Sequence, residues 1–141
     1  MIEQLTVLLE NKKGRLSKLC RDLADAEVNM HDLFVADTSD FGIVRIFCDT
    51  PQHAAAVLTD AGYRAGVMPV LAVRVSNKPG GLADLLEFIE QQGSNIEYGY
   101  CFSLGEDAAI DVLKVADDEI EAQLIQAGFD VVKAEEVYKL D

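Results

Sequence analysis

The turn that decides the fold reads Ser76-Asn77-Lys78-Pro79-Gly80-Gly81-Leu82, and it joins an apolar stretch at about 70–76 to the pattern of an amphipathic helix. Pro79 fixes its own φ angle near the value of a turn or of a first helical position. Gly80 and Gly81 carry no side chain, so another backbone or a small molecule can approach them closely. The stretch therefore predicts a strand that passes through a tight bend into the start of a helix.

The same turn occurs a second time, 66 residues earlier in the chain. An ungapped shift places Asn11-Lys12-Lys13-Gly14-Arg15-Leu16 on Asn77-Lys78-Pro79-Gly80-Gly81-Leu82. Matching positions continue along the chain: Leu5/Leu71, Val7/Val73, Leu19/Leu85, Leu23/Ile89, Asn29/Asn95, Val44/Ile110, Ile46/Val112, Leu58/Leu124 and Gly62/Gly128. Because one shift aligns all of these positions, we infer a duplication, with repeat 1 at 1–68 and repeat 2 at 69–141.

Both repeats show the pattern of a strand, a helix, two strands, a second helix and a last strand. Apolar residues recur at the helical spacing i, i+3, i+4, i+7 in each: Leu16, Leu19, Cys20 and Leu23, and Leu82, Leu85, Leu86 and Ile89. Second helices are predicted at 51–61 and 117–127, and turns between the middle strands at Thr38–Asp40 and Gly105–Asp107. The order β-α-β-β-α-β predicts an α+β fold of two ferredoxin-like βαββαβ units packed side by side, with antiparallel sheets and helices on one face.

Composition and charge exclude several classes of protein. The chain has 141 residues, 50% of them hydrophobic, and a formal net charge of −13. Such a field repels phosphate, so we expect neither nucleic acid nor a membrane as partner. No apolar stretch approaches the ~20 residues that span a bilayer, and the first residues lack the features of a signal peptide. Three widely spaced cysteines fit neither a disulfide framework nor a metal site, so we expect a cytoplasmic protein with no metal and no cofactor.

The helix start after Gly80 has the properties of a receptor for a small carboxylate. The first N–H groups of a helix have no partner within the helix and carry positive partial charge. Asn77 and Asn95 each offer a hydrogen-bond donor and an acceptor. A free amino acid requires this mixture, because its carboxylate needs donors and its ammonium needs acceptors.

The pattern Asn-x-Pro-Gly-x-Leu, followed by a helix and by an asparagine at the next strand, resembles the ACT domain. ACT domains are small ferredoxin-like modules that regulate enzymes of amino-acid biosynthesis by binding amino acids between two domains. The resemblance covers nearly the whole chain. It implies ligand-binding roles for Asn77, Pro79, Gly80, Gly81, Leu82 and Asn95 in repeat 2, and for Asn11, Gly14, Leu16 and Asn29 in repeat 1.

Repeat 1 departs from the family pattern at Lys13, which stands where the family often has proline. The departure weakens the pre-organisation of that turn, so the turn of repeat 2 is the better candidate site. Lys12, Lys13, Arg15 and Lys18 surround the first turn with positive charge. This basic cluster could attract an anionic effector, although a solvated helix start is the simpler interpretation.

Simpler interpretations also exist for other conspicuous residues. The asparagines could cap their helices while the glycines provide the backbone angles of a turn. We expect His31, whose counterpart is Glu97, to have no function, and His53 to be exposed. The acidic residues at 117–121 suit the positive end of a helix dipole better than a metal.

Aromatic and sulfur-containing side chains are expected to serve packing. Tyr98, Tyr100 and Phe102 alternate along one strand and should pack on one face of the sheet, with Tyr98 bordering a ligand as the alternative. The three cysteines, Cys20, Cys48 and Cys101, lie on apolar faces and should pack in the core.

The sequence carries no P-loop, no nucleophile elbow and no metal-ligating cluster, so we expect no enzymatic activity. We predict a regulatory protein that binds an amino acid at the interface between two ACT-like domains. A separate metabolic enzyme is the expected protein partner, and exposed sheet edges favour a homodimer. The alternative is a ligand-free scaffold for dimerisation or for interaction with other proteins.

Overall fold

The computed structural model describes residues 1–36, 40–103 and 106–141. It divides into a first unit, Glu3–Met68 with Ala134–Asp141, and a second unit, Met1–Ile2 with Pro69–Lys133. Each unit thus holds most of one repeat and a terminal segment of the other. The turns predicted at Thr38–Asp40 and Gly105–Asp107 lie partly outside the described residues. Within the described ranges no helix is long and apolar enough to cross a bilayer.

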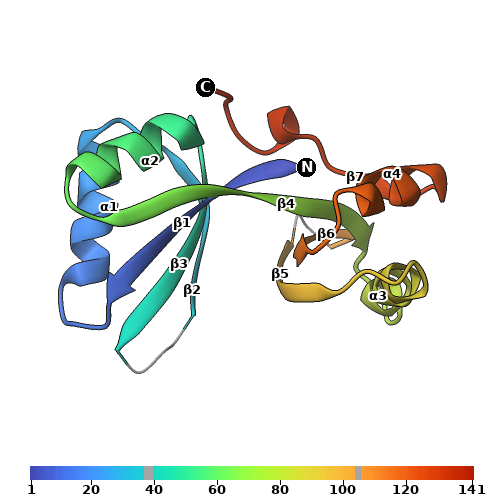
Figure 1. Ribbon diagram of the computed structural model, residues 1–141. Coiled ribbons are helices and arrows are strands. Elements are labelled where there is room, and N and C mark those ends of the chain that lie inside the picture. The colour runs from blue at the N-terminus through green and yellow to red at the C-terminus, as the bar shows by residue number, and fades with distance from the viewer. Residues whose placement is uncertain (37–39, 104–105) are drawn as a thin grey trace. The chain divides into compact units, whose positions relative to one another are not determined.

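The first unit is an antiparallel sheet with two helices. Its strands are β1 (Ile2–Glu10), β2 (Met30–Ala36), β3 (Phe41–Cys48) and the first part of β4 (Arg64–Ser76), in the order β2-β3-β1-β4. Figure 1 shows α1 (Arg15–Asp25) and α2 (Pro51–Asp60) on one side of these strands. The core between sheet and helices consists of Leu5, Val7, Leu9, Leu19, Leu23, Val28, Val44, Ile46, Cys48, Ala54 and Leu58.

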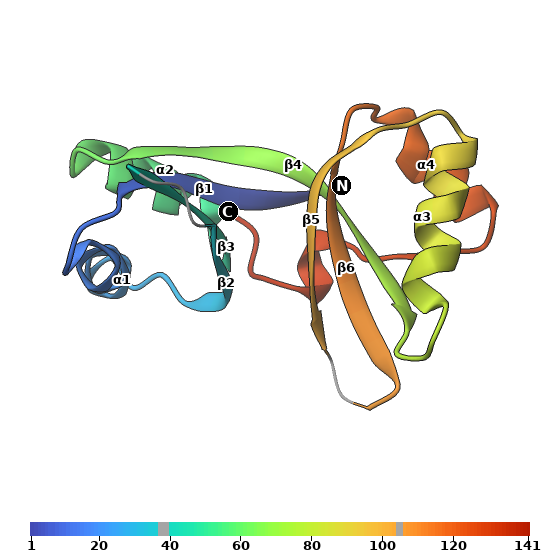
Figure 2. The same ribbon diagram turned by 90° about the horizontal axis from the view of Figure 1, so that it is seen from below.

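The second unit repeats this architecture. The rest of β4 is joined by β5 (Ile96–Ser103), β6 (Ala108–Val115) and β7 (Asp130–Val131), in the order β7-β4-β6-β5. Figure 2 shows α3 (Gly81–Gln91) and α4 (Glu119–Gln126) on the same side of β5 and β6. Its core consists of Leu71, Val73, Leu85, Ile89, Leu113, Val115, Ile120 and Leu124. The predicted α+β fold of two βαββαβ units is therefore confirmed.

The last strand of repeat 1 and the first strand of repeat 2 are one continuous strand. The sequence predicts two separate strands here, but β4 runs without a break from Arg64 to Ser76. It contributes residues 64–68 to the first unit and residues 69–76 to the second. Pro69 is compatible with this continuity because its fixed φ angle lies near that of extended backbone.

The third strands of the two repeats do not correspond at the 66-residue shift. Val35 of β2 pairs with Val44 of β3, whereas Cys101 of β5, the counterpart of Val35, pairs with Asp111 of β6. Asp111, and not Ile110, therefore takes the place of Val44. The β5–β6 hairpin encloses one residue more than the β2–β3 hairpin, which moves all of β6 by one position. The predicted equivalences Val44/Ile110 and Ile46/Val112 are wrong for this reason.

Candidate functional site

Both predicted turns end on a glycine with a left-handed backbone. Gly14 (φ 85°) precedes α1 and Gly80 (φ 91°) precedes α3, and neither helix has a side chain as its N-terminal cap. The interpretation of the asparagines as helix caps is therefore wrong. Pro79 lies in the turn before Gly80 and not in the helix. The sharp bend is produced by glycine, because only glycine adopts this conformation without strain.

Gly81 is required by the packing of the chain on itself. A Cβ atom at this position would lie 2.3 Å from the carbonyl oxygen of Ser76. The group that approaches Gly81 closely is thus the backbone carbonyl of Ser76 in the same turn. A ligand contact of Gly81 stays a prediction.

Asn77 and Asn11 tie their turns to the neighbouring hairpins. The backbone N–H of Asn77 donates to the carbonyl oxygen of Asp107 at 3.1 Å, and its Nδ2 donates to that of Glu106 at 3.3 Å. The backbone N–H of Asn11 donates to the carbonyl oxygen of Asp40 in the same way, also at 3.1 Å. Both side chains are exposed. The two asparagines hold equivalent places in the two units, and their ligand contacts stay predictions.

Asn29 and Asn95 also occupy equivalent places, just before β2 and β5. Their carbonyl oxygens accept hydrogen bonds from the N–H groups of Asp49 (2.9 Å) and Ala116 (3.2 Å). Both residues are exposed, which leaves their amide groups accessible from solvent.

A groove of about 410 Å³ lies in the second unit between α3, β5 and β6. Leu82 and Leu86 of α3 and Leu113 of β6 form apolar parts of its wall. Its other lining residues are Ile96, Gly99, Tyr100, Cys101 and Asp111. Leu82 is the one residue of the predicted site that lines this groove. Leu16, its counterpart in repeat 1, is likewise partly exposed on α1.

Gly99 lies in the wall of this groove, close to the side chain of Leu113. Gly99 pairs with Leu113, and a Cβ atom on Gly99 would lie 2.6 Å from Cδ2 of Leu113. Its counterpart in the first unit is Leu33, which pairs with Ile46 and packs against the core. At this place repeat 1 has a leucine side chain and repeat 2 has none, and the side chain of Leu113 lies where a Cβ atom of residue 99 would be.

Asp111 is a buried carboxylate in the wall of this groove. Only 4% of the residue is exposed, and Oδ2 has no hydrogen-bond partner among the described residues. Burial raises the pKa of Asp111, because water no longer stabilises the charged form. The sequence patterns did not identify this residue as part of a site. The available signal was a single acid within the apolar strand Ala108–Val115, at a position that the hairpin offset turns toward the helices.

The cysteine prediction holds in part. Cys48 is buried as expected, whereas Cys20 is half-buried and Cys101 is exposed, so the core assignment of Cys101 is wrong. Cys101 lies on β5, the last strand of its sheet, where the side chain borders the groove instead of packing under a helix. Tyr98, Tyr100 and Phe102 are half-buried and alternate with exposed residues, as predicted.

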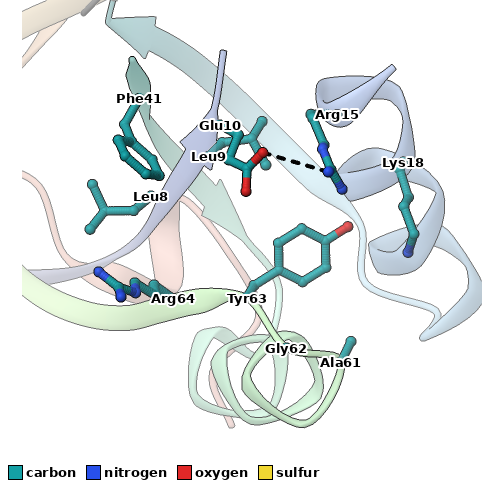
Figure 3. A pocket seen from close by; sticks show the side chains of 10 residues that line it. All are labelled: Leu8, Leu9, Glu10, Arg15, Lys18, Phe41, Ala61, Gly62, Tyr63 and Arg64. Carbon is teal, nitrogen blue, oxygen red and sulfur yellow. Dashed lines mark ion pairs between the residues drawn. The ribbon is translucent and has the colours of Figure 1, made fainter. Parts of the chain in front are cut away.

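A second hollow, of about 310 Å³, lies in the first unit and is lined by Glu10, Arg15, Lys18, Tyr63 and Arg64 among others (Figure 3). It includes part of the predicted basic cluster.

Three of the four cations of this cluster lie beside two carboxylates. Lys12 and Arg15 lie 3.1 and 3.5 Å from the carboxylate of Glu10, and these cations hold its pKa below the usual range. Nζ of Lys18 lies 2.7 Å from the carboxylate of Asp22. The cluster therefore fits the simpler interpretation of a solvated helix start better than a site for an anion.

The two histidines lie outside both hollows. His31 lies 2.7 Å from the carboxylate of Asp49, and His53 is exposed as predicted. The acids Glu119 and Glu121 occupy the first turn of α4, which agrees with the helix-dipole interpretation.

Residues 1–140 match the family that is described as the ACT domain pair. A comparison with curated protein sequences finds no match. Among solved structures, protein BT0572 from Bacteroides thetaiotaomicron superposes with a TM-score of 0.91 at 33% identity, over 99% of this chain and 96% of that one.

The ligand-free regulatory subunit of aspartate kinase from Thermus thermophilus superposes with a TM-score of 0.65 at 14% identity, over 89% of this chain and 91% of that one. The regulatory subunit of aspartate kinase from Thermus flavus superposes with a TM-score of 0.60 at 16% identity, over 90% of this chain and 88% of that one. At these identities the two subunits share the fold with this chain.

Proposed function

Because this chain belongs to the family of ACT domain pairs, we propose that it is a regulatory protein that binds a free amino acid and has no catalytic activity of its own. ACT domains are regulatory modules. Their role is to convert the binding of a small effector into a change in a partner protein. A metabolic enzyme of amino-acid synthesis is the expected partner. That the ligand lies between the two repeats stays a prediction.

The groove beside α3 is the observation that carries this proposal. Its volume of about 410 Å³ lies within the range of small-molecule sites, roughly 300–1,000 Å³. It is predominantly apolar, with one buried acidic group, which is the usual composition of a site that binds and orients a small ligand. Leu82, at the end of the turn that predicts an amino-acid site, forms part of its wall.

Regulation requires that the ligand prefer one state of the protein over another. A ligand held in the groove touches α3, β5 and β6 together, so it favours arrangements in which these elements stay in place. A partner that recognises this arrangement would then bind the liganded protein more tightly, and the ligand would gain affinity by the same factor.

A thermal-shift panel with the twenty proteinogenic amino acids tests the proposal. A ligand at about 100 times its Kd adds ~2.7 kcal/mol to the free energy of unfolding. For a chain of this size the midpoint temperature rises by roughly 5–10 °C. Isothermal titration calorimetry of each positive amino acid then gives Kd and stoichiometry. An unchanged midpoint with all twenty would reject the proposal.

A scaffold without a ligand is the second candidate function. Exposed apolar side chains on two strands of the first unit, Phe34, Val35 and Phe41, favour it, because such side chains often mark an interface. Sedimentation that shows a stable dimer, together with no thermal shift from any amino acid, would support this function.

A further inference from the structure

We propose that Asp111 binds the ammonium group of an amino acid with an apolar side chain, and that this site belongs to repeat 2 alone. The inference rests on the proposed function and deepens it. It assigns the class of ligand, the group that recognises its charge, and the repeat that holds it.

Asp111 is 4% exposed, lines the groove, and has an oxygen without a hydrogen-bond partner among the described residues. A buried carboxylate without partners is costly, and such groups are normally paired or hydrogen-bonded. A cationic donor that enters the groove would supply the missing partner through a charge-assisted hydrogen bond.

The two repeats differ at positions that line this groove. Val44, which takes the place of Asp111 in the first unit, is fully buried in the core. Leu33, which takes the place of Gly99, packs against that same core. Repeat 2 thus differs at two positions that line one groove: one lacks the side chain that repeat 1 has there, and the other places a carboxyl group in the wall.

The remaining wall of the groove is mostly apolar. Leu82, Leu86, Ile96 and Leu113 are apolar, and Asp111 is the only charged side chain among the described residues that line the groove. A hard metal ion requires several oxygen ligands, so one carboxylate in an apolar wall suits it poorly. An amino acid with an apolar side chain matches both features of the wall, because its α-ammonium group suits Asp111 and its side chain suits the apolar residues.

The start of α3 is placed to receive the other end of such a ligand. Leu82 lies in the first turn of this helix and in the groove wall. The N–H groups of Gly81 and Asp84 already donate to carbonyl oxygens of the turn, so the first-turn donors for a ligand are those of Leu82 and Ala83. The helix dipole favours a negative charge there, where Asp84 already carries one. An amino acid could therefore direct its ammonium to Asp111 and its carboxylate to the first turn of α3.

Calorimetry with the full-length protein tests the assignment. The probes are L-valine, L-leucine, L-isoleucine, L-methionine and L-phenylalanine, each with the acid that lacks only the α-amino group. We expect at least one of the five to bind wild-type protein at least tenfold more tightly than its des-amino analogue. Asp111→Asn should weaken the affinity for that amino acid at least tenfold and change the affinity for its des-amino analogue less than threefold. As a control, Glu87→Gln removes a charge from an exposed position of α3 and should change neither affinity.

Each other outcome has a distinct meaning. If an apolar amino acid binds wild-type and Asp111→Asn protein equally, the assignment of Asp111 is wrong and the proposed function stands. If only polar or charged amino acids bind, the ligand class is wrong. If none of the twenty amino acids binds, the proposed function and this inference both fail.

A second measurement avoids substitutions at the site. Cys101 is exposed and borders the groove, whereas Cys20 lies on α1 of the first unit. The amino acid that binds should slow alkylation of Cys101 by iodoacetamide at least fivefold and leave the rate at Cys20 unchanged. Equal rates at Cys101 with and without that amino acid would contradict binding in this groove.

Discussion

The hydroxyl of Tyr138 accepts a hydrogen bond from the backbone N–H of Glu3 at 2.7 Å, across a separation of 135 residues in sequence. The tyrosine is buried, and its ring stacks on that of Phe47 with 6.5 Å between the centroids. Residues 134–141 follow repeat 2 in sequence, yet they form part of the first unit. Tyr138 is therefore buried in the first unit, although its position in the sequence belongs to repeat 2.

Truncation of Tyr138 should destabilise the first unit. We expect Tyr138→Ala to lower the free energy of unfolding by about 3–5 kcal/mol, because the ring leaves a cavity. Tyr138→Phe, which loses one hydrogen bond, should cost about 1 kcal/mol. Urea denaturation measures both, with the exposed Leu140→Ala as control. A cost for Tyr138→Ala no larger than that for Leu140→Ala would show that the segment is not packed in solution.

Replacement of Asp111 by valine should stabilise the protein at the expense of the site. Val44 shows that the position accepts valine, and removal of an unpaired buried carboxylate should gain about 1–3 kcal/mol at pH 7.

The gain should depend on pH in a defined direction. Burial raises the pKa of Asp111, so the folded state prefers the protonated form. The cost of the charged form is absent below the ordinary pKa of 3.8 and grows as pH rises through the folded-state value. Denaturation series between pH 4 and 8 should therefore show a difference between variant and wild type that increases with pH. A constant difference would mean that the valine acts through packing alone.

Asp49 should stabilise the segment that contains Lys139. Its Oδ1 lies 2.7 Å from Nε2 of His31 and accepts the backbone N–H of Lys139 at 2.7 Å. The hydrogen bond from His31, followed by that from Lys139, holds the pKa of Asp49 below its usual value of 3.8. This stabilisation is fully present above pH 3.8 and is lost as pH falls through the folded-state pKa.

Nuclear magnetic resonance can observe this arrangement directly. The carboxyl carbon of Asp49 should titrate below pH 3.8, and His31→Gln should move its pKa upward. Asp49→Asn should speed hydrogen exchange at the Lys139 amide several-fold, because a neutral amide oxygen is a weaker acceptor than a carboxylate. An unchanged exchange rate would show that the carboxylate does not hold the segment.

The cysteines should differ sharply in reactivity. Burial, with the nearby carboxylates of Asp49 and Asp141, raises the pKa of Cys48 to about 12, so almost no thiolate forms at pH 8. Cys101 is exposed. Iodoacetamide at pH 8 should modify Cys101 and leave Cys48 intact, as read by mass spectrometry of tryptic peptides. All cysteines should react in guanidinium chloride, and modification of Cys48 at the rate of Cys101 in native protein would contradict its burial.

The sequence was sufficient for the features that depend on periodicity. Leu19 and Leu23, like Leu85 and Ile89, are buried at the helical spacing that predicts them, and Gly62 and Gly128 end their helices with positive φ angles. The family resemblance, which rests on the duplicated order of elements and on the turn motif, is confirmed by the match to the ACT domain pair over residues 1–140.

The features that depend on strand pairing could not be predicted in the same way. The position of Asp111 is set by the length of one hairpin, since an offset of one residue moves every side chain of β6 to the other face. The contrast between Gly99 and Leu33 likewise emerges only from strand pairing, in which Gly99 lies opposite Leu113 and Leu33 opposite Ile46. Long-range contacts such as that between Tyr138 and Glu3 leave no periodic signal.

Substitution of Gly81 tests whether the fold requires a glycine at this position. A Cβ atom would lie 2.3 Å from the carbonyl oxygen of Ser76, so Gly81→Ala forces a shift of the backbone and should cost about 1–3 kcal/mol in stability. The matched control is Arg15→Ala, at the equivalent place of repeat 1, where a side chain is already present and a change within ~0.5 kcal/mol is expected. Thermal unfolding without ligand measures both variants. Equal midpoints would mean that the turn of repeat 2 relaxes without cost, and that the fold does not require a glycine at this position.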